Sequence, residues 1–158
     1  MTVAITEAPP AFDRWDELHA LLMASFAYMD GRIDPPSSLL RMDPQTLAGK
    51  ARFEKLLLAI ENDHVVGCLF LRAEPEALYA GKLAVDSAFR GKGIARKLFA
   101  AAENQARRAG LPFLELQTRI ELTENHETFA RLGFEKTGET AHAGYGRPTS
   151  ITMRKPVT

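Results

Sequence analysis

Residues Lys82–Ala109 read KLAVDSAFRGKGIARKLFAAAENQARRA, and the fold of the chain depends on this stretch. Leu83–Val85 is apolar and predicts a short strand. Gly93–Ala109 predicts a helix, because apolar residues recur in it at helical spacing and its many alanines have high helix propensity. Arg90–Ala95 joins the two elements. The stretch therefore predicts a strand, a glycine-containing turn and a helix in direct succession.

The turn between this strand and this helix has the properties of an anion site. Its two glycines allow backbone N–H groups to point toward one place, and the first turn of the helix adds amides without intrahelical partners. The residues concerned are Arg90, Gly91, Lys92, Gly93, Ile94 and Ala95. The turn has neither the Gly-Lys-Ser/Thr ending of a P-loop nor the third glycine of the dinucleotide fingerprint. Three interpretations remain: another phosphate ligand, a nonspecific nucleotide, or a tight turn with solvated charges.

The rest of the chain shows strand-like and helix-like patterns. Three consecutive strands precede the long helix, which favours a mixed sheet over the strict alternation of a parallel doubly wound fold. We expect an α/β fold with helices on both faces of the sheet, in one domain over residues 1–158. Asp13, Asp43 and Thr123 are expected to cap three of the helices. The expected strands are 2–5, 55–60, 65–72, 78–85, 113–118, 134–140 and one through 151–153, and the expected helices are 13–29, 43–52, 93–109 and 125–132.

The composition narrows the class of protein. The chain has 158 residues, a formal net charge of zero and one cysteine. Acidic and basic residues are interspersed, so no basic face for nucleic acid is expected. The first residues have neither the basic start nor the apolar core of a signal peptide, and no apolar run reaches the length of a membrane span. We expect a soluble cytoplasmic protein without a membrane partner, in which Cys68 is buried rather than nucleophilic.

The sequence resembles the Gcn5-related N-acetyltransferases, the GNAT family. Their signature, Arg/Gln-x-x-Gly-x-Gly/Ala after a strand, is matched by Arg90, Gly93 and Ala95. The downstream run Leu132-Gly133-Phe134 matches the Leu-Gly-Phe turn of the family. The resemblance implies a GNAT-like fold with a splayed, mostly antiparallel sheet. It also implies a site for acetyl-CoA, with the pyrophosphate at Arg90–Ala95 and no metal.

The same resemblance gives a role to the backbone of the central strand. In the family, a backbone N–H at a bulge of this strand binds the thioester carbonyl oxygen, and the pantetheine arm pairs with the strand as a partner strand would. The corresponding positions here are Leu83, Ala84 and Val85. Because both contacts use the backbone, side-chain substitution is expected to report little of this role.

Glu115 is the candidate for the general base. The run Leu114-Glu115-Leu116 resembles the strand of ribosomal-protein N-terminal acetyltransferases in which a glutamate relays the amine proton through water. His126 and Glu121 are alternatives, and a purely structural glutamate on the strand is the competing interpretation.

The general acid departs from the family pattern. The family tyrosine, whose hydroxyl meets the leaving thiolate, is replaced by Phe129. Tyr145, in a late glycine-rich loop, is the alternative proton donor or else a surface tyrosine. Asn125 matches by type the family asparagine that contacts pantetheine, although it lies about one helical turn closer to Phe129 than usual.

The resemblance implies transfer of an acetyl group from acetyl-CoA to a primary amine in a ternary complex, without an acyl-enzyme. The acceptor is a small-molecule amine or a peptide N-terminus, and the loops at 30–38 and 142–148 are too generic to specify it. Tyr28, Asp30, Arg32 and Asp34 lie on the acceptor side in the family, or are polar residues of a solvated loop. Because the acid hydroxyl is missing, a coenzyme A-binding sensor or interaction module with little turnover is the alternative function. A homodimer is compatible with the sequence.

Overall fold

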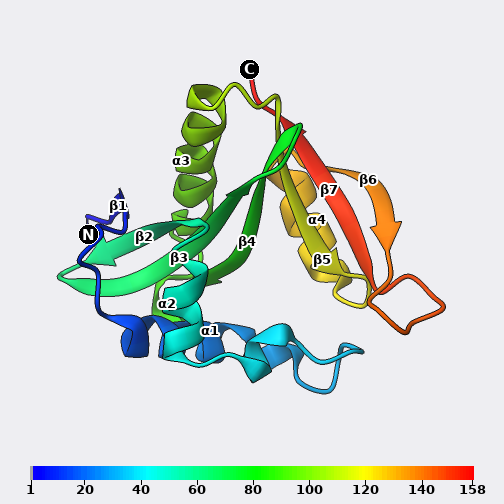
Figure 1. Cartoon of the computed structure of the whole chain (residues 1–158), viewed down its shortest axis with the longest axis horizontal. Coiled ribbons are helices and arrows are strands. Elements are labelled where there is room, and N and C mark those ends of the chain that lie inside the picture. The colour runs from blue at the N-terminus through cyan, green and yellow to red at the C-terminus, as the bar shows by residue number, and fades with distance from the viewer. Residues whose placement is uncertain (1) are drawn as a thin grey trace.

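A mixed sheet organises the computed structural model, which describes residues 2–158 (Figure 1). Within this range the sheet has seven strands in the order β1-β2-β3-β4-β5-β7-β6. Only β4 and β5 pair in parallel, so the predicted mixed, mostly antiparallel sheet is confirmed. The strands are β1 Ala4–Glu7, β2 Lys55–Glu61, β3 His64–Ala73, β4 Ala77–Val85, β5 Phe113–Arg119, β6 Glu135–Thr140 and β7 Ser150–Pro156. The helices are α1 Trp15–Phe26, α2 Pro44–Lys50, α3 Ile94–Arg108 and α4 Thr123–Arg131, with 3-10 turns η1 Ala27–Met29, η2 Ser38–Arg41 and η3 Ser87–Phe89.

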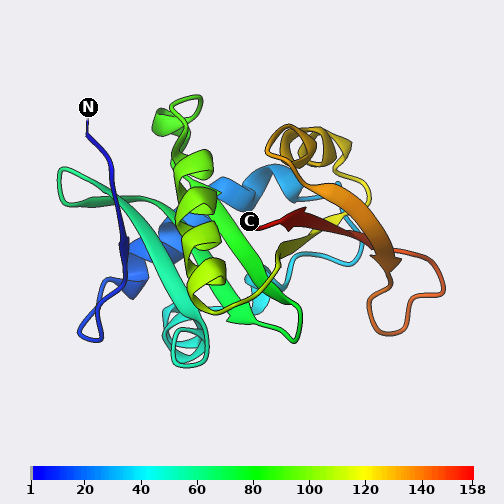
Figure 2. The same cartoon turned by 90° about the horizontal axis from the view of Figure 1, so that it is seen from above.

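Helices cover both faces of the sheet, as predicted. On one face, α1 and α2 bury Leu18, Leu22 and Leu47 against strand residues that include Phe70. On the other face, α3 buries a stripe that includes Leu98 against β2, β3, β4 and β5. Figure 2 shows α3 crossing in front of the strands while α1 runs behind them. Alternating side chains of the central strands therefore enter two separate cores.

The sheet opens between β4 and β5. These strands pair only at Ala77 with Phe113, Leu78 with Leu114 and Tyr79 with Glu115, and then diverge (Figure 1). The divergence separates an N-terminal arm, β1 to β4, from a C-terminal arm, β5 to β7. Beyond Tyr79, the edge of β4 that faces β5 has no partner strand among the described residues. The predicted splay is confirmed, and we call this opening the fork.

A bulge in β4 lies beside the fork. Opposite β3, Ala84 pairs with Cys68 and Gly81 pairs with Phe70, so Lys82 and Leu83 together face a single residue of β3. Lys82 has a φ of 55°, which is a left-handed conformation that few residues other than glycine adopt. The central strand therefore carries the bulge that the resemblance implies, beginning at Lys82.

Two of the three predicted helix caps are wrong. Asp43 accepts a hydrogen bond from the Thr46 amide at 2.7 Å and caps α2, as predicted. The N-cap of α1 is Arg14 and that of α4 is Leu122, and neither makes a side-chain cap. The start of α4 follows from burial. Leu122 is only 1% exposed and takes the N-cap position, so Thr123 becomes the first helical residue instead of the cap.

Several predicted boundaries also shift. Pairing with β2 extends from Ala4 to Glu7, so the first strand lies two residues beyond the predicted 2–5. The first helix tightens into η1 after Phe26, and α2 ends at Lys50. No helix within residues 2–158 is long and apolar enough to cross a membrane.

Residues 28–38, here called the strap, connect the two arms of the sheet. The strap leaves the end of α1 and reaches β5, α4 and the loop before β7, where polar contacts hold it. Tyr28, Arg32 and Asp34 are thus engaged with the C-terminal arm. The contacts are Asn125 to Tyr28, Arg32 to Glu124, Asp34 to Tyr145 and Arg147, and Arg119 to the carbonyls of Pro35 and Pro36.

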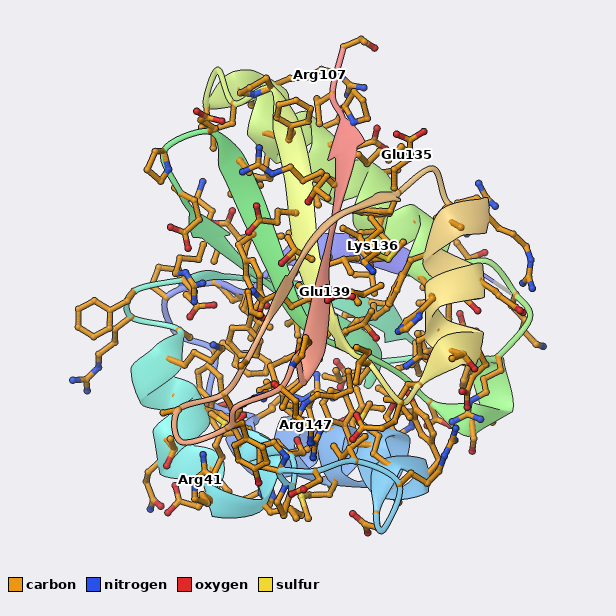
Figure 3. All side chains as sticks on the ribbon, turned by 90° about the vertical axis from the view of Figure 1, so that its right-hand side faces the viewer. Arg41, Arg107, Glu135, Lys136, Glu139 and Arg147 are labelled. Atoms are coloured by element: carbon orange, nitrogen blue, oxygen red, sulfur yellow. The ribbon has the colours of Figure 1, made fainter. Side chains whose placement is uncertain are left out.

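The outer strand β6 is charged. Figure 3 shows Glu135, Lys136 and Glu139 along it, and Lys136 pairs with Glu139 at 2.7 Å. Charges on an exposed edge oppose pairing with another strand.

Candidate active site

The predicted anion loop lies between the end of β4 and the start of α3. Gly91 and Gly93 have φ values of 76° and 77°, and Gly93 is the N-cap of α3. A Cβ atom added at either glycine would meet no atom within 4 Å, so the space in front of the loop is open. Arg90 and Lys92 are exposed. The amides of the first turn of α3 therefore face solvent beside two cations, which is the arrangement that binds a phosphate.

The core side of this loop is fixed by packing. Ile94 is 2% exposed and lies in the core under α3, while Ala95 is half-buried. Asp86 turns the chain after β4, since its side chain accepts a hydrogen bond from the Ala88 amide at 2.9 Å. The loop is thereby anchored at both ends.

The β4 backbone runs from the fork to this loop. Leu83 and Val85 contact the core under α3, whereas the buried Ala84 belongs to the core under α1. The backbones of Ala84 and Val85 pair with β3 on one side, Leu83 lies in the bulge, and the other side of this strand borders the fork. This open strand edge can pair with an extended ligand.

Glu115 lies where the fork closes. It pairs with Tyr79 of β4, and its Oε2 accepts a hydrogen bond from Nε of Arg154 at 2.8 Å. This bond raises the pKa of Arg154. The Glu115 side chain is 17% exposed. It borders a groove of about 570 Å³ lined by Arg72, Glu74, Pro75, Glu76, Tyr79, Glu115, Gln117 and Arg154.

The two alternatives to Glu115 face elsewhere. Nε2 of His126 lies 2.9 Å from the backbone oxygen of Arg119. Oε2 of Glu121 accepts a hydrogen bond from the Asp34 amide at 3.1 Å. Neither residue lines the groove that Glu115 borders. The structure thus brings only Glu115 of the three to the closed end of the fork.

Phe129, Asn125 and Tyr145 occupy three different environments. The Phe129 ring packs edge-on against Phe99 and Phe134, with centroids 6.1 and 6.2 Å away. Asn125 donates a hydrogen bond to the Tyr28 hydroxyl at 2.8 Å. The Tyr145 hydroxyl donates to Oδ1 of Asp34 at 2.7 Å, and this bond to a carboxylate raises the pKa of Tyr145. Asn125 and Tyr145 therefore both contact the strap.

Cys68 is fully buried, as predicted. Burial raises the pKa of its thiol to about 12. Almost no thiolate forms near neutral pH, so this side chain is not a nucleophile. No group of three His, Cys, Asp or Glu side chains suited to a metal ion occurs within residues 2–158.

Sequence reasoning did not single out Lys82, which lies at the bulge of β4. Its side chain leaves the bulge toward α1, where Nζ donates a hydrogen bond to Oγ of Ser38 at 2.7 Å and lies 5.9 Å from the centre of the Phe26 ring. Burial lowers the pKa of Lys82 to about 8, and the positive charges of Lys50, Arg119 and Arg41 add to this effect. A lysine inside an otherwise apolar strand was the available signal.

Comparison with known proteins agrees with this geometry. The model of the acetyltransferase (GNAT) family matches residues 15–134. The chain is 32% identical over 130 residues to an IAA acetyltransferase of Azospirillum brasilense, which covers 80% of this chain and 82% of that protein. It is 33% identical over 86 residues to an aminoalkylphosphonate N-acetyltransferase of Salmonella typhimurium, covering 51% of this chain and 56% of that protein. A paia N-acetyltransferase from Thermoplasma acidophilum, solved with coenzyme A, shares the fold with a TM-score of 0.81 at 14% identity, over 99% of both chains.

A forked mixed sheet with an anion loop at its central strand defines an acyl-CoA-dependent N-acetyltransferase. The chain belongs to the GNAT acetyltransferase family, because the family model spans most of its length and a relative above 30% identity covers four fifths of it. The resemblance inferred from Arg90, Gly93 and Ala95 is confirmed.

Proposed function

We propose that the chain transfers the acetyl group of acetyl-CoA to a primary amine by direct attack in a ternary complex. The observation that carries this proposal is the continuity between the open edge of β4 and the anion loop. The pyrophosphate would bind at Arg90–Ala95, and the pantetheine arm would pair with Leu83–Val85 inside the fork. The inert thiol of Cys68 supports direct transfer rather than an acyl-enzyme.

The chemistry requires a base, because an alkyl amine with a pKa near ~10.4 is mostly protonated at pH 7, and deprotonating it costs roughly 4.6 kcal/mol. We assign this role to Glu115, which Arg154 orients from the neighbouring strand. The amine nitrogen then forms a bond to the thioester carbon as the bond from carbon to sulfur breaks. The ammonium therefore loses two protons in all: Glu115 takes the first before the attack and passes it to water, and the second balances the proton that the thiolate gains.

The developing negative charge on the carbonyl oxygen needs a donor. We assign it to a backbone N–H among Leu83, Ala84 and Val85, next to the bulge. Loss of one such donor typically costs about 3 to 4 kcal/mol in acyl transfer. For the thiolate, Tyr145 is the candidate acid, although its hydroxyl would first have to leave Asp34.

A small amine is the acceptor we favour. The Salmonella typhimurium relative is named for acetylating an aminoalkylphosphonate, which is a small amine. A NatC complex solved with a Gag peptide and coenzyme A shares the fold at 20% identity, which keeps a peptide N-terminus as the second option. The cytoplasmic location and the homodimer stay predictions.

Release of the coenzyme A thiol during a screen of amines, amino acids and N-terminal peptides tests the proposal. We expect acetyl-CoA to bind in a calorimetric titration and at least one amine class to release thiol. Binding without release for any acceptor would instead support a coenzyme A-binding module, which the phenylalanine at position 129 favours. Equal competition by ATP and coenzyme A would indicate a nonspecific nucleotide site.

A further inference from the structure

Four basic side chains from four separate segments share one electrostatic site below the fork. They are Arg41 of η2, Lys82 of β4, Arg119 of β5 and His142 of the loop between β6 and β7. Lys82 donates to Ser38, the first residue of η2, and Arg119 donates to the carbonyls of Pro35 and Pro36, so both side chains contact the segment that ends in Arg41. Burial is the largest cause that lowers the pKa of Lys82 and of His142; the charges of Arg119 and Arg41 lower both further, and Lys50 also lowers that of Lys82. Figure 3 shows Arg41 at the same end of the molecule as Arg147 of that loop. We call Arg41, Lys82 and Arg119 the cation cluster.

No carboxylate forms an ion pair with the cation cluster. None of the ion pairs found among residues 2–158 includes Arg41, Lys82 or Arg119. Lys82 donates to one hydroxyl, on Ser38, and Arg119 donates to two backbone carbonyls. Arg41 is exposed. Donors and positive charge therefore remain available for a ligand.

The nearby acids each have a partner, and only one oxygen of Glu121 lacks one among the described residues. Asp34 accepts hydrogen bonds from Tyr145 and Arg147, and Glu54 pairs with Lys50 at 2.8 Å. Oε2 of Glu121 accepts the Asp34 amide, whereas its Oε1 is buried without a hydrogen-bond partner, and the negative charge of Glu121 favours the charged form of Arg119. The three cations of the cluster outnumber this one carboxylate. Desolvated like charges in one place are costly unless an opposite charge joins them.

The cluster also lies on the acceptor side of the fork. On β5, Glu115 and Arg119 share a face, because Leu114, Leu116 and Thr118 between and beside them are buried. Lys82 lies on the other branch and points to the same side, toward α1. The Cα atoms of Glu115 and Arg119 are roughly 13 Å apart along an extended strand. An acceptor that bridges the two residues would hold its amine near Glu115 and its second group near Arg119.

We infer that the acceptor amine carries an oxyanionic group, a carboxylate or a phosphonate, that is bound by Arg41, Lys82 and Arg119. This inference rests on the proposed function and narrows its acceptor class. Hydrogen bonds from charged donors to an oxyanion are about twice as strong as those to a neutral carbonyl. Lys82 and Arg119 would therefore bind an oxyanion more strongly than the Ser38 hydroxyl and the backbone carbonyls that they contact in the structure.

Matched acceptors test the inference. β-Alanine is compared with β-alaninamide, and 3-aminopropylphosphonate with 3-aminopropanol, at saturating acetyl-CoA. The wild-type chain should favour the acidic member of at least one pair by about tenfold or more in kcat/KM. Arg41→Gln should reduce that preference roughly tenfold and leave the KM for acetyl-CoA unchanged. Arg108→Gln, which removes an exposed cation from the far end of α3, should leave the preference intact.

A second measurement separates this inference from the proposed function. Calorimetry of β-alanine and 3-aminopropylphosphonate in the presence of coenzyme A needs no turnover. Binding that depends on Arg41 without any thiol release would support the cluster and overturn the proposed function. Turnover with no acidic preference in either pair would support the function and overturn the cluster, and so would a preference that Arg41→Gln leaves intact. Neither turnover nor Arg41-dependent binding would overturn both.

Discussion

Replacing Lys82 with Met should stabilise the protein while weakening its use of acidic acceptors. Burial lowers the pKa of Lys82 from 10.5 to about 8; Lys50, Arg119 and Arg41 lower it further, and Glu54 opposes them. A shift of this size corresponds to roughly 3 kcal/mol of lost stability at pH 7. Methionine forgoes the hydrogen bond to Ser38, worth about 1 kcal/mol. It adopts the same φ of 55° at a cost similar to that of lysine. We expect a net gain of about 1 to 2 kcal/mol, or a Tm higher by about 3 to 6 °C.

The sign of the pH dependence makes this prediction specific. The folded pKa is below the unfolded value of about 10.4, so the unfolded chain binds more protons between these two values. Stability of the wild-type chain therefore rises with pH in this window, and the full cost is present only below pH 8. At pH 9.5 the free-energy cost of burying Lys82 falls to roughly a third of its value at pH 7, and the stability gained by the Met variant should nearly vanish.

Urea unfolding followed by circular dichroism at pH 7 and 9.5 gives the comparison. Lys97→Met, which changes an exposed lysine of α3, is the matched control and should show little difference at either pH. A Lys82→Met variant that is less stable than wild type at pH 7, or whose gain does not depend on pH, would refute the reasoning. A residue kept at a cost in stability is expected where function requires it.

Four further substitutions test the rest of the site. Gly93→Ala should weaken acetyl-CoA binding at least about tenfold in calorimetry, because a φ of 77° disfavours alanine and its Cβ would enter the open space before α3. Arg90→Ala should also weaken acetyl-CoA binding. Unchanged affinity in both variants would exclude the anion loop as the binding site of the pyrophosphate. Glu115→Gln should lower kcat/KM by about 10² to 10⁴ and remove the acidic limb of its pH profile; a retained limb would exclude Glu115 as the base. Phe129→Tyr should raise kcat at unchanged acetyl-CoA affinity if its hydroxyl reaches the thiolate; an unchanged kcat would show that leaving-group protonation does not limit the rate.

The conformation of the loop proposed to bind the donor could be predicted because this loop is local in sequence. One continuous run supplies the strand, the glycines and the start of α3, and the positive φ values of Gly91 and Gly93 are what glycine in such a turn predicts. The splay of the sheet was predicted from the family resemblance and not from the residue pattern. Asp43 could be recognised as a cap because Pro44 follows it, whereas Asp13 and Thr123 had no such support. Their helices begin where tertiary packing places them.

The proposed acceptor side could not be predicted, because it is assembled from distant segments. The cation cluster combines η2, β4 and β5, and no spacing in the sequence brings Arg41, Lys82 and Arg119 together. The left-handed backbone of Lys82 is likewise a consequence of pairing with β3, not of the residue type. Asn125 matches a family residue by type, and its contact with Tyr28 of the strap could not be read from the sequence. Its role toward pantetheine stays a prediction.

The proposed donor loop and the strap differ in how readily they tolerate substitution. The donor loop depends on backbone amides and glycine conformations, so few substitutions there preserve binding of a phosphate. The strap instead holds the arms together through side chains, including Arg32 with Glu124 at 2.7 Å and Asp34 with Arg147 at 2.9 Å. These pairs are exposed, and exposed pairs contribute about 0 to 1 kcal/mol each. Substitutions in the strap can therefore alter the surroundings of Arg119 at little cost to the fold, while the acyl donor site stays the same.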